Sequence, residues 1–438
     1  GTNSTAPITM WANADATGEG FIYIQNYNDV TTQGAPIVMG GSTAAADTSP
    51  GGYAVTNTSS RGGVMLGSSN GISNANVRVL SNGGDITIRG RATAASSWGI
   101  IGYAGFNVNS GAGRVLMDGA ATNTGNGIDL EGTTGILGTI TSAAADSATP
   151  AVRLIGSSTN TSTADAGQRG LYITPGITVS ATNGGDVSLE ATSAAVHTTN
   201  PGAISLHGVN VTSNTGDVTL NGGSTGVHLS TSANTSNIGA IPANTATGLV
   251  TIIGDRISSA GTANIKTTGN VVIESVASAF AGAVSVSDLN VTAGAGNFRV
   301  GKTTNTSDIS MTGSIAVTGE IAAYGANLTV GSLTTTATSG NGILVKATGD
   351  IVTTAGTSGA RRSISVTGTN STAPITLWSN SDASGTGNIQ IGAYTDISGR
   401  NGDITMAGST AANDTNPTGY AVGASEGIDL GNAATATD

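Results

Sequence analysis

The sequence predicts an all-β protein built as a single-file parallel β-helix, in which short strands wind coil upon coil around a narrow core. Three observations predict this fold. A phrase of turn residues followed by alternating aliphatic residues recurs along the chain, helix signals are nearly absent, and the first residues of the chain return near its end.

The recurring phrase is a Gly-Asp or Gly-Ala turn followed by two aliphatic residues two positions apart. It occurs in residues 84–90, 185–189, 202–208, 216–222 and 402–408. Side chains two apart on a strand share a face, and the residue between them points the other way. The alternation therefore predicts an inward set and an outward set. The inward set is Ile86, Ile88, Val187, Leu189, Ile204, Leu206, Val218, Leu220, Ile404 and Met406; the outward set is Thr87, Ser188, Ser205, Thr219 and Thr405.

Composition supports stacked coils over other architectures. The chain has 67 glycines in 438 residues and only 3% aromatic residues, and Gly or Asn interrupts almost every window that could form a helix. Strands this short cannot bury their aliphatics alone, whereas stacking places each one on its neighbour above and below. Glycine supplies the positive φ of the corners, and we expect corner Asn and Asp side chains to bond their own backbone, as in Asn82-Gly83.

The chain begins again near its end. Residues 1–9 return letter for letter as residues 368–376, an offset of 367 residues. We therefore interpret residues 1–367 as one long-period repeat unit and residues 368–438 as the start of the next copy, continuing the same solenoid. A globular enzyme has no need of a partial second copy, whereas a fibre of stacked units accommodates one.

The phrases Gly-Asp-Ile-Thr-Ile (residues 84–88) and Gly-Ile-Asp-Leu-Glu-Gly (residues 127–132), in Ser/Thr/Asn/Gly-rich sequence without Cys, resemble the shafts of filamentous-haemagglutinin-type adhesins and related large repetitive bacterial exoproteins. That resemblance implies a right-handed parallel β-helix, secretion to the bacterial cell surface, and a role in attachment, aggregation or surface coats.

Charge and hydropathy exclude other classes. A net charge of −11, with only 15 scattered basic residues, argues against nucleic-acid binding, which needs clustered Lys and Arg. No apolar run approaches the roughly 20 residues of a membrane span, so none is expected in this segment. The absence of Cys excludes disulfides and thiolate metal sites.

The leading interpretation is a non-enzymatic, extracellular structural or adhesive shaft, whose partners are copies of itself, end to end or side by side, or the surface of a host or neighbouring cell. Two alternatives stay open. One is a carbohydrate-active β-helix enzyme of the lyase or glycosidase kind, which needs clustered carboxylates near a basic residue. Its candidates are Asp118, Asp129, Glu131, Arg114 and Arg153. No catalytic residue is assigned under the leading interpretation.

The second alternative is a calcium-dependent binding module, since turn Asp and Asn offer oxygen ligands; otherwise no cofactor is expected. His207 and His228 are weak candidates for another metal. They lie 21 residues apart, about one coil, on the outward phase of their strands, but no third ligand accompanies them. The other interpretation is two surface histidines.

Trp11 and Trp378 occupy equivalent places in the two copies. Because Ile8 and Met10 face inward, Trp11 faces outward, where a large ring needs cover. A corner loop of the same chain is one cover, and lateral contact with a neighbouring molecule is the other.

Overall fold

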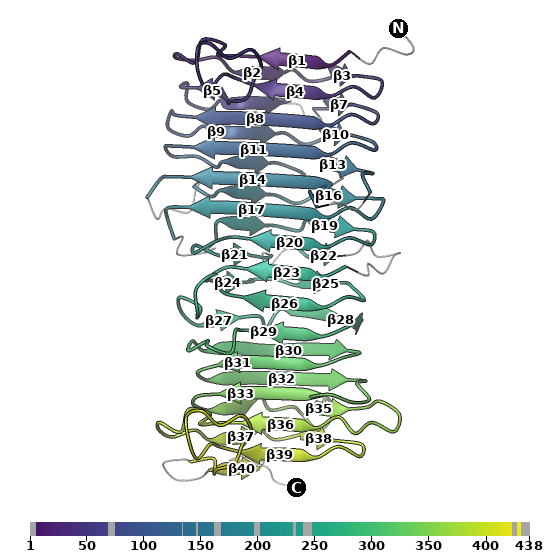
Figure 1. Cartoon of the computed structure of the whole chain (residues 1–438), viewed down its shortest axis with the longest axis vertical. Helices are drawn as coiled ribbons and strands as arrows, with labels where there is room; N and C mark the ends of the chain where they lie inside the picture. The colour runs from purple at the N-terminus through teal and green to yellow at the C-terminus, as the bar shows by residue number, and fades with distance from the viewer. Residues whose placement is uncertain are drawn as a thin grey trace. The chain divides into compact units, whose positions relative to one another are not determined.

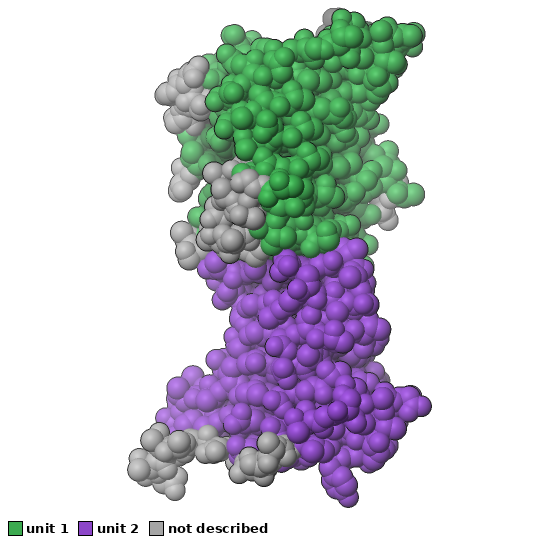
Figure 2. All heavy atoms as spheres, turned by 90° about the vertical axis from the view of Figure 1, so that its left-hand side faces the viewer, with its two compact units in different colours: residues 1–254 green, residues 255–438 purple. Residues whose placement is uncertain are grey.

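The computed structural model describes residues 6–68, 75–133, 135–145, 148–161, 168–196, 202–230, 234–239, 248–422 and 427–430. Throughout these residues the regular structure is β-strand, and the strand ladders are parallel. The chain divides into two compact units, residues 1–254 and 255–438, which Figure 2 colours separately. The predicted repeat start at Gly368 lies inside the second unit.

The first unit winds three parallel sheets, and each coil contributes one strand to each sheet in turn (Figure 1). Sheet A stacks β1 (Ile8–Trp11), β4 (Ile37–Gly40), β8 (Ile86–Ala92), β11 (Val115–Ala121), β14 (Val152–Ser158), β17 (Val187–Ser193), β20 (Val218–Asn221) and β23 (Val250–Ile253), and β5 (Ala54–Thr56) also pairs with β8.

The other two sheets of this unit follow the same order. Sheet B stacks β2 (Ile22–Ile24), β6 (Gly62–Leu66), β9 (Trp98–Gly102), β12 (Ile128–Leu130), β15 (Leu171–Ile173), β18 (Ile204–Leu206) and β21 (Val227–His228). Sheet C stacks β3 (Asp29–Thr31), β7 (Arg78–Leu80), β10 (Asn107–Asn109), β13 (Gly138–Ser142), β16 (Ile177–Ala181), β19 (Asn210–Ser213) and β22 (Ser236–Gly239). The predicted parallel β-helix is confirmed.

The second unit has the same winding with shorter coils. Its sheet A stacks β26 (Val271–Glu274), β29 (Phe298–Val300), β31 (Ile321–Gly325), β33 (Ile343–Ala347), β36 (Ile375–Trp378) and β39 (Ile404–Ala407). Its remaining strands are β24 (Ile257–Ser258), β25 (Ala263–Ile265), β27 (Val284–Ser285), β28 (Leu289–Ala295), β30 (Ile309–Val317), β32 (Leu328–Thr335), β34 (Ile351–Thr353), β35 (Arg362–Val366), β37 (Ile389–Ile391), β38 (Thr395–Ser398) and β40 (Ile428–Leu430).

In the middle of this unit, two long strands each pair with two shorter strands. β30 pairs with both β27 and β28, and β32 pairs with both β34 and β35. The coils shorten accordingly: 22 residues separate the paired Ile321 and Ile343, whereas 49 separate the paired Ile37 and Ile86 of the first unit.

Aliphatic side chains in register form the core. In sheet A of the first unit the paired column is Ile37, Ile86, Val115, Val152, Val187 and Val218, all 0–1% exposed. Each coil removes apolar surface from water at about 25 cal/mol per Å², so the core is continuous although each strand is short.

The inward predictions are confirmed for the eight residues from Ile86 to Leu220, each 0% exposed. Two are wrong: Ile404 is 44% exposed and Met406 is half-buried, because β39 has a strand on one side only among the described residues. In the outward set Ser188 and Ser205 are only 8% and 0% exposed. Neighbouring side chains cover them, as the next subsection describes for Ser205.

Some corner side chains bond their own backbone as predicted: Asn109 accepts the N–H of Gly111 and Asn221 that of Gly223. Others, among them the Asp of the Gly-Asp phrases, join successive coils instead. The Oδ1 atom of Asp186 accepts the backbone N–H of Asp217 at 2.8 Å, and that of Asp217 accepts the N–H of Leu249 at 2.7 Å. The same bond links Asp85 to Arg114, Asn270 to Asn297, Asn297 to Glu320, Asp308 to Asn327, Asn327 to Asp350 and Asp350 to Asn388. The Asp of the Gly-Asp-Ile-Thr-Ile phrase therefore caps the next coil.

Asn82 illustrates the correction at a single corner. It adopts φ 55° and is followed by Gly83 at φ 130°, as its turn position predicts. Its Nδ2 atom, however, donates to the carbonyl of Thr32 at 2.7 Å, on the preceding coil.

Candidate functional site

The chemically richest part of the described chain is the outward face of sheet B, across β12, β15, β18 and β21. The register stacks Asp129 on Tyr172, Tyr172 on Ser205, and Ser205 on His228. Each of these residues lies between inward aliphatics, so the alternation that builds the core also places polar groups in one outward column.

These outward groups are buried, which alternation alone does not predict. Asp129 is 4%, Ser205 0% and His228 1% exposed. Two residues from the turns before the strands cover the column: Asn126 and Arg169, only 2% and 3% exposed. Buried polar groups need partners, and several members of the cluster find one in another member.

A chain of contacts joins the cluster. Asn126 Nδ2 donates to Asp129 Oδ2 at 2.7 Å, and the Asn126 side-chain oxygen accepts the backbone N–H of Arg169 at 2.8 Å. The Arg169 guanidinium lies over the Tyr172 ring, 5.2 Å from its centroid, a favourable cation–π geometry. Sequence reasoning missed Asn126 and Arg169, which lie 43 residues apart with no motif to connect them.

The two histidines meet at the other end of the cluster. The His207 ring lies edge-on to Tyr172, with centroids 4.9 Å apart, and to His228, with centroids 6.0 Å apart. Its Nε2 atom is 2.9 Å from the Ser205 hydroxyl. The interpretation of two solvated surface histidines is therefore wrong for His228, and His207 is half-buried.

Both imidazoles are neutral at neutral pH. Burial, followed by the positive charge of Arg169, lowers the pKa of His207 to about 4. Burial also lowers the pKa of His228 to about 4, and the neighbouring His207 adds to the effect. Neutral imidazole is the form that binds metals, yet no group of three His, Cys, Asp or Glu in the described residues is arranged to hold an ion. In the described part of the chain, His207 and His228 therefore have no third ligand of these types.

Asp129 behaves in the opposite way. Burial raises its pKa to about 7, and the charge of Glu131 adds to the rise. Hydrogen bonds from Asn126 and Trp98 oppose it. Burial also raises the pKa of Glu131. Near pH 7 this carboxyl can both give and take a proton, close enough to Arg169 to interact with its charge.

The other residues predicted for an enzyme are not part of this cluster. Asp118 lies on β11 of sheet A, where the Tyr53 hydroxyl donates to it at 2.9 Å and burial raises its pKa. Arg153 forms a two-pronged ion pair with Glu190, at 2.7 and 2.8 Å. Asp129 and Glu131 are therefore brought together with Arg169, and neither Arg114 nor Arg153 joins them.

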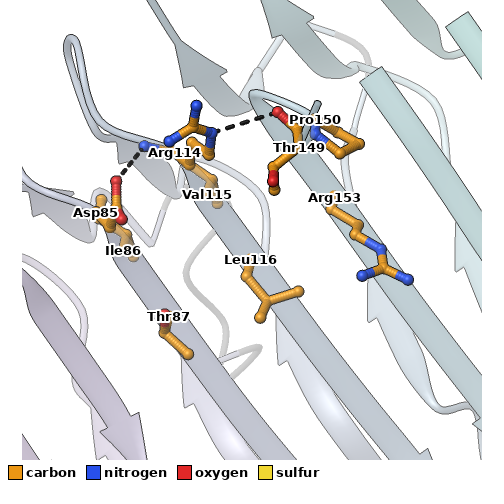
Figure 3. A pocket seen from close by; sticks show the side chains of 9 residues that line it. All are labelled: Asp85, Ile86, Thr87, Arg114, Val115, Leu116, Thr149, Pro150 and Arg153. Carbon is orange, nitrogen blue, oxygen red and sulfur yellow. Dashed lines mark hydrogen bonds between the residues drawn. The ribbon is translucent and has the colours of Figure 1, made fainter. Parts of the chain in front are cut away.

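Arg114 and Arg153 instead border a shallow hollow on sheet A (Figure 3), of about 180 Å³. Asp85 accepts the backbone N–H of Arg114, whose Nε donates to the carbonyl of Thr149 at 3.3 Å. The hollow is lined by Asp85, Ile86, Thr87, Arg114, Val115, Leu116, Thr149, Pro150 and Arg153, a set without an aromatic platform for a sugar ring.

The two tryptophans make the same hydrogen bond in the two copies. Trp11 Nε1 donates to the Ser42 hydroxyl and Trp378 Nε1 to the Ser409 hydroxyl, both at 2.8 Å. Trp378 is only 3% exposed, and Lys346 Nζ lies 3.8 Å from its ring centroid. It has almost no surface left for a neighbouring molecule, so the predicted lateral contact depends on the half-buried Trp11.

No family model, curated protein or solved structure matches this chain. The described residues contain no helix long and apolar enough to cross a membrane.

Proposed function

We propose that this chain is a non-enzymatic, extracellular structural or adhesive shaft, part of a large repetitive surface protein, filament or coat of the filamentous-haemagglutinin-like kind. Its mechanism is mechanical, because successive described coils pair their backbones and several corner side chains bond the next coil. The bacterial surface is the proposed location. Copies of the chain or a cell surface are the proposed partners.

One observation carries the proposal: several interactions of residues 8–55 recur at the equivalent residues 367 positions later. Asp47 accepts the backbone N–H groups of Thr43 and Ala44. Asp414 accepts those of Thr410 and Ala411 in the same way. The bridges Gly20–Val55 and Gly41–Gly52 return as Gly387–Val422 and Gly408–Gly419. A repeat kept in this detail suits a protein that stacks units, since no catalytic group needs duplication.

Locating the protein tests the proposal. Antibodies raised against the purified chain should label filaments or a coat on intact cells in electron microscopy, and protease added outside the cells should remove the label. Label confined to the interior of the cells would contradict the proposal.

A second function, action on a polysaccharide, would use Asp129, whose pKa of about 7 suits proton transfer at neutral pH; because only 4% of Asp129 is exposed, this function also needs the cluster to open to a substrate. If the chain has this function, the native protein should cleave an acidic polysaccharide and so create new chain ends. The Asp129→Asn variant should cleave it about a hundredfold more slowly, or slower still. Asp118→Asn is the control, because it alters a half-buried carboxylate, also with a raised pKa, on another sheet. Absence of release from a panel of such polysaccharides contradicts this second function.

A further inference from the structure

The two copies differ sharply at one surface, the face of β39 and of the segment that follows it. Ile404 is 44% exposed, whereas its equivalent Ile37 is 0% exposed. Tyr420 is 86% exposed, whereas its equivalent Tyr53 is half-buried. We call the surface formed by Ile404, Met406, Tyr420 and Val422 the open face.

In the first copy the same surface is occupied by β8. Its two inward aliphatics pair with β4, Ile86 with Ile37 and Ile88 with Met39. All four of these side chains are 0% exposed. β8 therefore supplies two apolar groups, two residues apart, that match the column of β4.

β8 also reaches the segment after β4. Its Gly90 and Arg91 pair with Ala54 and Val55 of β5. The Arg91 guanidinium lies over the Tyr53 ring, 4.5 Å from the centroid, while the Tyr53 hydroxyl donates to Asp118 on β11. Tyr53 is thus held by a cation from the next coil and by a carboxylate from the coil after it.

We infer that the open face takes a strand with the sequence pattern of β8, supplied by a further repeat. Two aliphatics pair with Ile404 and Met406, and an arginine five residues after the first aliphatic stacks on Tyr420. This inference deepens the proposed function and rests on it, because only a repetitive protein supplies such a coil.

The pattern discriminates between occupants. If a second molecule docked its first coil instead, Ile8 and Met10 of β1 could meet Ile404 and Met406. Five residues after Ile8, however, stands Asn13 rather than an arginine. That occupant would leave the Tyr420 ring without its cation.

An engineered, longer chain tests the inference. In it, residues 432–438 are replaced by a second copy of residues 68–121, which adds the β8 and β11 sequences after residue 431. Nitration of Tyr420 should fall about tenfold or more relative to the chain of 438 residues, and amide exchange of residues 404–407 should slow by at least the same factor. Tyr53 serves as the internal control and should stay protected in both chains.

Two variants of the added copy test whether its side chains make the proposed contacts. If the residue equivalent to Arg91 in the added copy is changed to Ala, amide exchange of residues 404–407 should stay slow, but Tyr420 should regain part of its reactivity. A copy carrying Ile86→Asp should lose both effects, because a charge would enter the apolar column.

Unchanged Tyr420 reactivity and exchange in the extended chain would overturn the inference, even if microscopy shows filaments on cells. Concentration-dependent slowing of exchange at residues 404–407 in the unextended chain, with Tyr420 still reactive, would assign the face to the first coil of a second molecule. That result also overturns it.

Discussion

The segment from Ile8 to Val55 and its equivalent from Ile375 to Val422 share many turns and hydrogen bonds but differ in burial. Ile37 is 0% and Ile404 is 44% exposed, while Trp11 is half-buried and Trp378 is 3% exposed. The difference has one cause: β8, from the following coil, covers the first segment, whereas β33, from the preceding coil, covers the second. Local sequence sets the path of a coil, and the neighbouring coils decide how much of it is buried.

The largest expected effect follows from that cause. Ile37→Asp should lower the free energy of unfolding by roughly 4 kcal/mol or more, because a charge enters a dry column, and Leu220→Asp should behave alike. Ile404→Asp, the same change on the open face, should cost no more than about 1 kcal/mol. Urea unfolding followed by circular dichroism measures all three. Equal losses at the two isoleucines would show that neighbouring coils do not control burial.

The two tryptophans should show the opposite difference, because here the residue of the second segment is the more buried one. Trp378→Ala should cost about 3 to 5 kcal/mol, since the ring is buried against Lys346, and Trp11→Ala about 1 to 2 kcal/mol. Both variants lose the same bond to a serine, so the difference isolates the covering coil. Differential scanning calorimetry at one pH suffices. A larger loss at Trp11 would contradict the account.

The cluster on sheet B lies in coils between the two matched segments and should give a pH dependence of its own. The folded pKa of about 4 at His207 and His228 lies below the ordinary 6.5, so stability is lost as pH falls from about 6.5 to 4. Asp129 acts oppositely, because its raised pKa gives stability that is present below 3.8 and lost as pH rises to about 7.

Near pH 5 the two histidines outweigh the single carboxyl, leaving a net loss of about 1 kcal/mol per unit of acidification from these groups. Asp129→Asn should steepen this loss, and the double change His207→Gln with His228→Gln should reverse its sign. Unfolding midpoints from pH 4.5 to 7 measure it. An unchanged slope in both variants would show that the cluster is not the source.

The smallest expected difference concerns the two acidic turns. Hydrogen bonds, the first from the backbone of Ala44, hold the pKa of Asp47 below its ordinary value. Thr418, where the first copy has Gly51, adds a hydroxyl bond and lowers the pKa of Asp414 to about 2. Thr418→Gly should raise the Asp414 pKa toward that of Asp47 in a carboxyl NMR titration. No change would mean that Thr418 does not hold the carboxylate.

The alternation of aliphatic and polar residues was enough to predict the fold and most of the core, because inward residues such as Ile86 and Leu220 recur at every second position of their strands. It failed at Ser205 and Ile404, whose burial depends on coils distant in sequence. It also could not predict that Asp129 lies near enough to Arg169 to interact with its charge, because such neighbours follow from coil lengths that vary from 18 to 49 residues. The corner Asp was visible as a motif, but its bond to the next coil was not.

The most direct test of the central claim is the length of particles made from chains with one, two and three copies of residues 1–367, each followed by residues 368–438. Electron microscopy should show straight particles that lengthen by the same increment with every added copy, because each copy ends on a face that the next one covers. Particles that stay the same length, or that form separate beads joined by bends, would contradict a continuous stacked shaft.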